Sequence, residues 1–173
     1  MKLALLLTTA LLLVGCATTT THTMNHGMPM DHTMHMVHSE EDFLVNMIPH
    51  HQEAVDTSLI IAAQTNNPAL KDLADNIVTA QRQEIAMMQE WLTDSSVEPT
   101  YQNMMPDLDA LEGDSRDIAY LQGMIMHHTM AVMMAEQVLS LEPSLPVYSF
   151  AKQVIAVQTD EIAQMEVLLL AYE

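Results

Sequence analysis

The fold is decided by a stretch of sequence that occurs twice, as FLVNMIPHH at residues 43–51 and as YLQGMIMHH at residues 120–128. The two copies lie 77 residues apart, and their register holds without a gap as far as Met88 and Met165. Chance rarely keeps such a register, so the chain contains an internal repeat. The other matched positions are Ala54-Val55 with Ala131-Val132, Gln81 with Gln158, and Glu84-Ile85 with Glu161-Ile162.

Each copy of the repeat has the pattern of two helices. Apolar residues recur at steps of three and four positions, the spacing of a buried helical face. Ser39 precedes three acidic residues, a favourable helix start, and Asn67-Pro68 supplies a cap and a first position for the second helix. We expect Asp114 to cap the third helix, and the turn at residues 142–146 to precede the fourth.

These patterns predict an all-α fold, an antiparallel four-helix bundle built from a duplicated helical hairpin. The bundle is expected over residues 39–173, with repeats at about residues 39–92 and 115–171. Hydrophobic residues make up 49% of the chain and aromatic residues only 4%, a composition that favours packed helices over sheets. Pro49 leaves two interpretations open, a kink before His50 or a first helix that starts near Pro49.

Residues 1–15 have the pattern of a signal peptide. The apolar run at residues 3–14 is too short to cross a bilayer, which takes about 20 residues. It ends in Leu13-Val14-Gly15-Cys16, which resembles a lipobox and implies that Cys16 carries the lipid, with acyl chains such as palmitate. We therefore expect a membrane-anchored lipoprotein of the cell envelope, facing the periplasm or the cell exterior. The alternative is an ordinary secreted protein in which Cys16 has no such role.

Residues 16–38 have no apolar periodicity, so we expect a flexible tether that follows the lipidated cysteine. A segment without a core has no packing reason for methionine, whereas a thiol-free Met/His tract can bind Cu(I) or Cu(II). Drift of a low-complexity sequence is the alternative. The candidate ligands of the tether are His22, Met24, His26, Met28, Met30, His32, Met34, His35, Met36 and His38.

Polar residues interrupt the apolar helical faces of the bundle. In each repeat a pair of histidines follows a methionine by one helical turn. Sulfur beside imidazole suits copper, with Cu(I) favoured and Cu(II) second. Histidines that merely bond to a neighbour are the alternative. The candidate ligands of the bundle are His50, His51, His127, His128, Met47, Met88, Met124, Met134 and Met165.

Two motifs, Met47-Ile48-Pro49-His50-His51-x-x-Ala54-Val55 and Gln81-x-x-Glu84-Ile85-x-x-Met88-x-x-Trp91-Leu92, resemble the signature of the family called domain of unknown function 305. The resemblance covers about residues 40–173. It implies a ferritin-like bundle and, for members of the CopM type, periplasmic copper binding by Met and His. The chain departs from the family pattern at Thr57, which stands where the second repeat has Met134. Two equivalent sites are therefore disfavoured, and one site shared between the halves is the alternative.

Net charge and motif content narrow the function. A formal net charge of −18 with 5 Lys and Arg excludes nucleic acid as a partner, because phosphate binding needs clustered basic residues. No glutamate is followed by histidine at the third position, the motif of di-iron enzymes, and no catalytic residue is expected. The sequence predicts a non-catalytic copper-binding lipoprotein that sequesters or delivers copper and exchanges it with a partner protein. The alternative is a metal-free envelope protein that docks a partner through its bundle.

Overall fold

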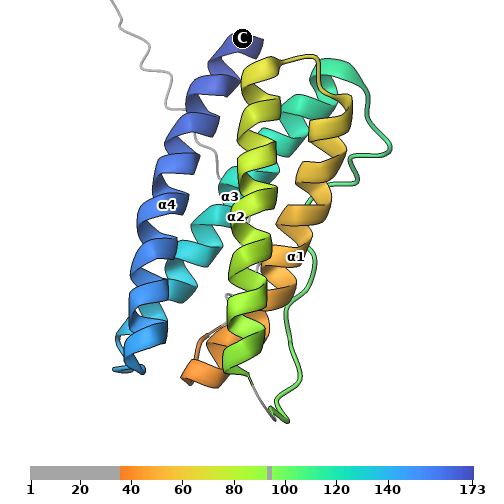
Figure 1. Cartoon of the computed structure of the whole chain (residues 1–173). Coiled ribbons are helices and arrows are strands. Elements are labelled where there is room, and N and C mark those ends of the chain that lie inside the picture. The colour runs from red at the N-terminus through yellow and green to blue at the C-terminus, as the bar shows by residue number, and fades with distance from the viewer. Residues whose placement is uncertain (1–35, 93–94) are drawn as a thin grey trace, which may run out of the picture. The chain divides into compact units, whose positions relative to one another are not determined.

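The computed structural model describes residues 36–92 and 95–173, and this part of the chain contains four α-helices and no strand (Figure 1). The first hairpin packs α1 (Glu40–Gln64) on α2 (Pro68–Trp91). The second packs α3 (Gly113–Leu139) on α4 (Leu145–Leu169), and a single 3-10 turn, η1 (Leu170–Tyr172), follows. The predicted all-α four-helix bundle is confirmed. The predicted signal peptide, Cys16 and the tether as far as residue 35 lie outside the described residues.

The helix starts follow local chemistry. The Ser39 hydroxyl accepts a hydrogen bond from the Asp42 amide at 3.0 Å, and the Asn67 side chain caps α2 as expected. Pro49 lies inside α1, so the first helix does not begin there. The third helix differs from the prediction, because Glu112 is its N-cap and Asp114 lies in its first turn. A carboxylate in the first turn still interacts favourably with the helix dipole.

The apolar core consists of two clusters, one toward each end of the bundle. The Phe43 cluster consists of Val37, Phe43, Leu44, Met47, Val55, Val78, Ile85, Met88, Ala131, Met134, Ala135, Val138, Val147, Phe150, Ala151 and Val154. The Tyr120 cluster consists of Ala54, Ile61, Leu70, Leu73, Ala74, Ile77, Leu108, Tyr120, Leu121, Met124 and Met165. Helices α1 and α4 therefore run from the Phe43 cluster to the Tyr120 cluster, and α2 and α3 run the opposite way.

The linker between the hairpins, residues 92–112, is long because of these directions. Helix α2 ends beside the Phe43 cluster, whereas α3 begins beside the Tyr120 cluster. The linker must therefore run back along the bundle, and Figure 1 shows it passing alongside α1. Leu108 is buried in the Tyr120 cluster, where its carbonyl accepts a hydrogen bond from Arg116 Nε at 3.1 Å. This course takes the linker past the middle of α1.

Candidate metal centre

The four histidines of the bundle lie together in its middle, each with no exposed surface. On α1 and α3 they stand between the residues of the Phe43 cluster and those of the Tyr120 cluster. The rings of His50 and His127 lie against each other at a tilt of 35°, with their centroids 3.6 Å apart, and His51 and His128 flank them at about 6 Å. The two repeats are thus related by a pseudo-twofold axis that passes near this inner pair of histidines. The same axis relates the Phe43 cluster to the Tyr120 cluster.

The two outer histidines are each held by a glutamate of the neighbouring helix. His51 Nε2 lies 2.9 Å from Glu84 Oε2, and His128 Nε2 lies 2.8 Å from Glu161 Oε2. A carboxylate bonded to one ring nitrogen fixes the orientation of the ring and leaves the other nitrogen available, the arrangement that commonly supports metal-bound histidine. The matched glutamates of the two repeats therefore have matched roles.

The two inner histidines are held less symmetrically. His50 Nε2 lies 3.1 Å from the backbone carbonyl of His127. His127 Nε2 makes no hydrogen bond, and Glu53 Oε2 lies 3.4 Å away from it. Of the four buried histidines, His127 alone has neither ring nitrogen hydrogen-bonded.

Buried polar groups normally have hydrogen-bond partners. The histidine layer, which consists of the four buried histidines with Gln81 and Gln158, departs from that rule. Unpartnered buried atoms are found on all four histidines and on the matched residues Gln81 and Gln158 of α2 and α4. A metal ion would satisfy such nitrogen atoms directly, because it binds the imidazole lone pair. The unpartnered imidazole atoms are His50 Nδ1, His51 Nδ1, His127 Nδ1, His127 Nε2 and His128 Nδ1.

The electrostatics of the layer favour neutral histidines at its centre. Burial lowers the pKa of His50 and of His127 well below its ordinary value of 6.5, and the neighbouring histidines lower both further. Both rings are therefore neutral near pH 7, the form that binds metal ions.

The linker closes this layer on one side, and its contacts are not matched in the second repeat. The Asn46 side chain accepts hydrogen bonds from the amides of Thr100 and Tyr101 at 2.8 and 2.9 Å. The buried Glu53 carboxylate accepts from the amides of Met104 and Met105, at 2.9 and 3.0 Å, and from the Tyr101 hydroxyl. The Tyr101 ring lies edge-on to His50, with 5.2 Å between centroids.

Glu53 and Tyr101 were not among the residues predicted from sequence. The available signal was a departure from the repeat, since Asn46 stands where the second copy has Gly123, and Glu53 stands where it has Met130. An alignment that records only matches passes over such positions.

The predicted methionine ligands are all buried, but they lie on both sides of the histidine layer. Met47, Met88 and Met134 belong to the Phe43 cluster, and Met124 and Met165 belong to the Tyr120 cluster. Of the predicted tether ligands, only Met36 and His38 lie within the described residues, and both are exposed. Residues 36–92 and 95–173 contain no group of three His, Cys, Asp or Glu side chains arranged to hold a metal ion.

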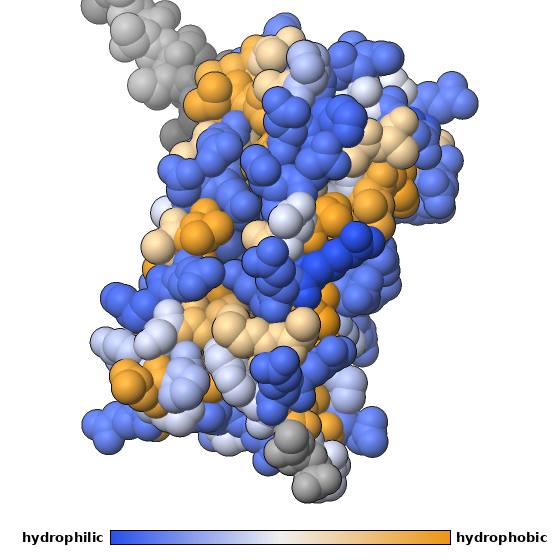
Figure 2. Space-filling view, in the orientation of Figure 1, coloured by the Kyte–Doolittle hydropathy of each residue, from blue (hydrophilic) through white to orange (hydrophobic). Residues whose placement is uncertain are grey.

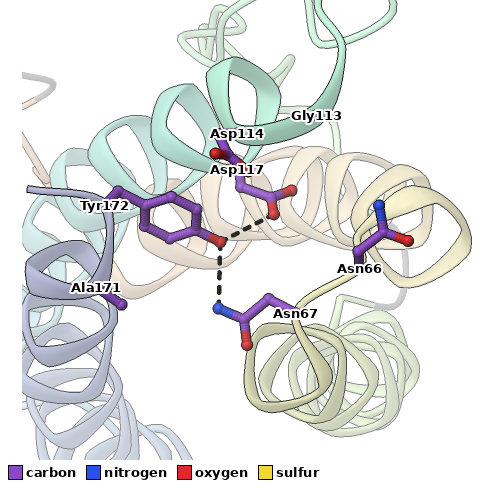
Figure 3. A pocket seen from close by; sticks show the side chains of 7 residues that line it. All are labelled: Asn66, Asn67, Gly113, Asp114, Asp117, Ala171 and Tyr172. Atoms are coloured by element: carbon purple, nitrogen blue, oxygen red, sulfur yellow. Dashed lines mark hydrogen bonds between the residues drawn. The ribbon is translucent and has the colours of Figure 1, made fainter.

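A separate pocket of about 220 Å³ lies at the end of the bundle where η1 meets the α1–α2 turn (Figure 3). The Tyr172 hydroxyl donates to Asp117 Oδ2 at 2.9 Å and accepts from Asn67 Nδ2 at 3.2 Å. These bonds satisfy the polar groups with one another and tie the chain's last turn to α2 and α3. The lining contains none of the predicted metal ligands; it consists of Asn66, Asn67, Gly113, Asp114, Asp117, Ala171 and Tyr172.

Comparisons with known proteins agree with this architecture. The family described as "Domain of unknown function (DUF305)" matches residues 15–92, 40–107 and 98–169. The solved structure of CopM in its Cu(II)-bound form is 31% identical, with a TM-score of 0.70, and the match covers 80% of this chain and 100% of that chain. The Cu(I)-bound form is 32% identical, with a TM-score of 0.69, and covers 79% and 99%.

A DUF305 protein from Streptomyces coelicolor is 27% identical, with a TM-score of 0.67, over 77% of this chain and 93% of that one. No curated protein matched the chain.

Proposed function

The chain belongs to the DUF305 family, and from that membership we propose that it binds copper ions in its buried histidine layer. Support comes from CopM, which has been solved in Cu(I)-, Cu(II)- and silver-bound forms. Within this chain the proposal rests on the five buried imidazole nitrogens that have no hydrogen-bond partner. Leaving such a group unsatisfied costs about 1–3 kcal/mol, and copper ligation would remove that penalty.

The compartment and the anchor are part of the proposal. A signal-peptide pattern that ends at Cys16 supports a lipoprotein held at the cell envelope, and the Met/His-rich segment that follows supports copper capture close to the membrane. Within the described residues, no helix combines the length and apolarity that crossing a bilayer requires. We propose that the protein sequesters or delivers copper without catalysing a reaction.

Copper titration of the full chain tests the proposal against a matched pair of variants. One variant changes His50, His51, His127 and His128 to Gln, and the other changes His22, His26, His32, His35 and His38 to Gln. Circular dichroism and thermal unfolding verify that each variant keeps its helices. We expect the bundle variant to lose the tightest copper and the tether variant to retain it. Equal tight binding by the bundle variant and the wild type would refute the proposed site.

The metal-free docking function has one feature in its favour, a groove between α2 and α4. Figure 2 shows the face that carries these helices, with apolar patches between hydrophilic side chains. A wild-type chain that binds neither Cu(I) nor Cu(II) would favour this second function. The groove is lined by Ala69, Asp72, Leu73, Asn76, Asp160, Ala163, Gln164, Val167 and Leu168.

A further inference from the structure

We propose that Glu53 and His127 together form a ligand pair for one divalent metal ion, so that the bundle binds oxidised copper on its linker side only. The inference rests on the proposed copper function and adds a ligand set, an oxidation state and a stoichiometry to it. Three observations carry it: the distance between the two side chains, the chemistry of their donor atoms, and the lack of an acidic counterpart in the second repeat.

The distance fits two ligands of one ion better than it fits a hydrogen bond. His127 Nε2 and Glu53 Oε2 are 3.4 Å apart, and His127 Nε2 has no hydrogen-bond partner although its side chain has no exposed surface. Metal–nitrogen and metal–oxygen bonds are each about 2.0–2.1 Å long, so an ion bound to both atoms would subtend an angle of roughly 110°. That angle suits two neighbouring positions of a tetrahedral or distorted site.

The donor atoms select the oxidation state. Imidazole nitrogen with carboxylate oxygen suits Cu(II) and Zn(II), whereas Cu(I) prefers thioether sulfur. At such a site Cu(II) binds more tightly than Zn(II), which follows the general order of divalent affinities. Glu53 is buried to 7% exposure beside His50 and His127, and a carboxylate ligand at such a position lowers the energy of a divalent cation.

The same pair does not occur on the other side of the pseudo-twofold axis. Position 53 corresponds to Met130, so the second repeat has no carboxylate at the matching position, and Glu84 and Glu161 contact the outer histidines instead. One ion per chain is therefore expected at the centre. Only two protein ligands are in place, and the linker residues Tyr101, Met104 and Met105 above them are half-buried. The remaining positions of the ion would be filled by water or by these linker side chains.

The test uses the full chain with its five tether histidines changed to Gln, so that Cu(II) bound by the tether does not mask the centre. Glu53→Gln in this background should lower Cu(II) affinity at least tenfold, change the Cu(II) electron paramagnetic resonance spectrum, and leave Cu(I) affinity within about twofold. Zn(II) titration should give a weaker site that is lost in the same variant. Asp117→Asn, which removes a buried carboxylate at the end of the bundle away from the histidines, should retain the Cu(II) site.

Tyr101→Phe separates ligation from linker packing, because it removes a linker contact of Glu53 and leaves the carboxylate in place. It should keep Cu(II) affinity at or above that of the parent. Loss of Cu(II) in Tyr101→Phe as large as in Glu53→Gln, or full Cu(II) binding in a folded Glu53→Gln, would overturn the inference. Those outcomes leave copper binding itself standing if the parent chain still binds Cu(I). The proposed function fails on different results, when the wild type binds neither ion or when the four-histidine variant binds copper as tightly as the wild type.

Discussion

At the scale of single residues, the buried inner histidines make the stability of the metal-free protein depend on pH. Well above pH 6.5 the rings of His50 and His127 are neutral in both the folded and the unfolded chain. As the pH falls below 6.5, the unfolded chain takes up protons that the folded chain does not, because the folded pKa of each ring is lowered by burial. The free energy of unfolding should therefore fall, by up to about 1.4 kcal/mol per pH unit for each histidine, until the lowered folded pKa is reached.

Urea unfolding of the metal-free chain between pH 7.5 and pH 5.5 measures this effect. The double variant His50→Gln, His127→Gln should show a weaker slope over the same range. A wild-type slope equal to that of the double variant would contradict the prediction.

The residue scale also shows where sequence reasoning succeeded and where it did not. The four histidines could be found because the repeat copies them and because a polar group on a buried helical face needs a partner. Glu53 lies on α1 beside His50 and His51, yet its role depends on Tyr101, Met104 and Met105 of the linker. No helical periodicity relates a linker residue to a residue some fifty positions earlier, so that contact could only come from the structure.

At the scale of elements, helices were predictable and the linker course was not. Caps such as Ser39 and Asn67 interact with residues within one helical turn, so the local sequence is enough to predict them. The direction of α3 relative to α1 depends on packing between halves, which a local pattern does not encode. The long return of the linker follows from that direction.

The closeness of the linker to α3 gives a prediction at this scale. A Cβ atom at position 123 would lie 2.8 Å from Pro106 Cδ and 3.2 Å from Met105 Sδ. Gly123→Ala should therefore push the linker outward, at a cost of roughly 1–3 kcal/mol for overpacking. The better helix propensity of Ala offsets up to about 1 kcal/mol of this.

Thermal and urea unfolding measure the difference. Gln122→Ala, at an exposed neighbouring position of α3, is the matched control and should be neutral or slightly stabilising. If Gly123→Ala is as stable as that control, the linker does not pack on α3 as tightly as the distances indicate.

At the scale of the whole molecule, a lipid anchor on Cys16 would determine where the protein holds the copper that we propose it binds. We predict that Cys16 carries the lipid, because it follows an apolar run and Gly15 in the order of a lipobox. Cys16→Ser should release the protein from membranes, as measured by fractionation and by labelling with a radioactive fatty acid. A processed Cys16→Ser protein that stays in the membrane fraction would exclude this assignment.

The last prediction is that the Met/His-rich segment and the bundle hold copper with different affinities. The sequence predicts no core for residues 17–38, so ligands there must be ordered as they bind, and each residue fixed costs roughly 1–2 kcal/mol. The bundle histidines are already positioned by packing, so their site should be tighter, while the tether holds more ions and releases them more readily.

A deletion of residues 22–35 tests this and spares Val37, which is buried in the Phe43 cluster and whose amide donates to Gln137 Oε1 at 2.9 Å. Competition titrations with a Cu(I) chelator and with a Cu(II) chelator should show that the deletion lowers the number of ions bound and leaves the tightest affinity unchanged. The helical signal and the thermal midpoint should stay those of the full chain, since the deleted residues precede the packed part. If the deletion instead removes the tightest copper, the bundle histidines are structural and the tether is the copper-binding part of the molecule.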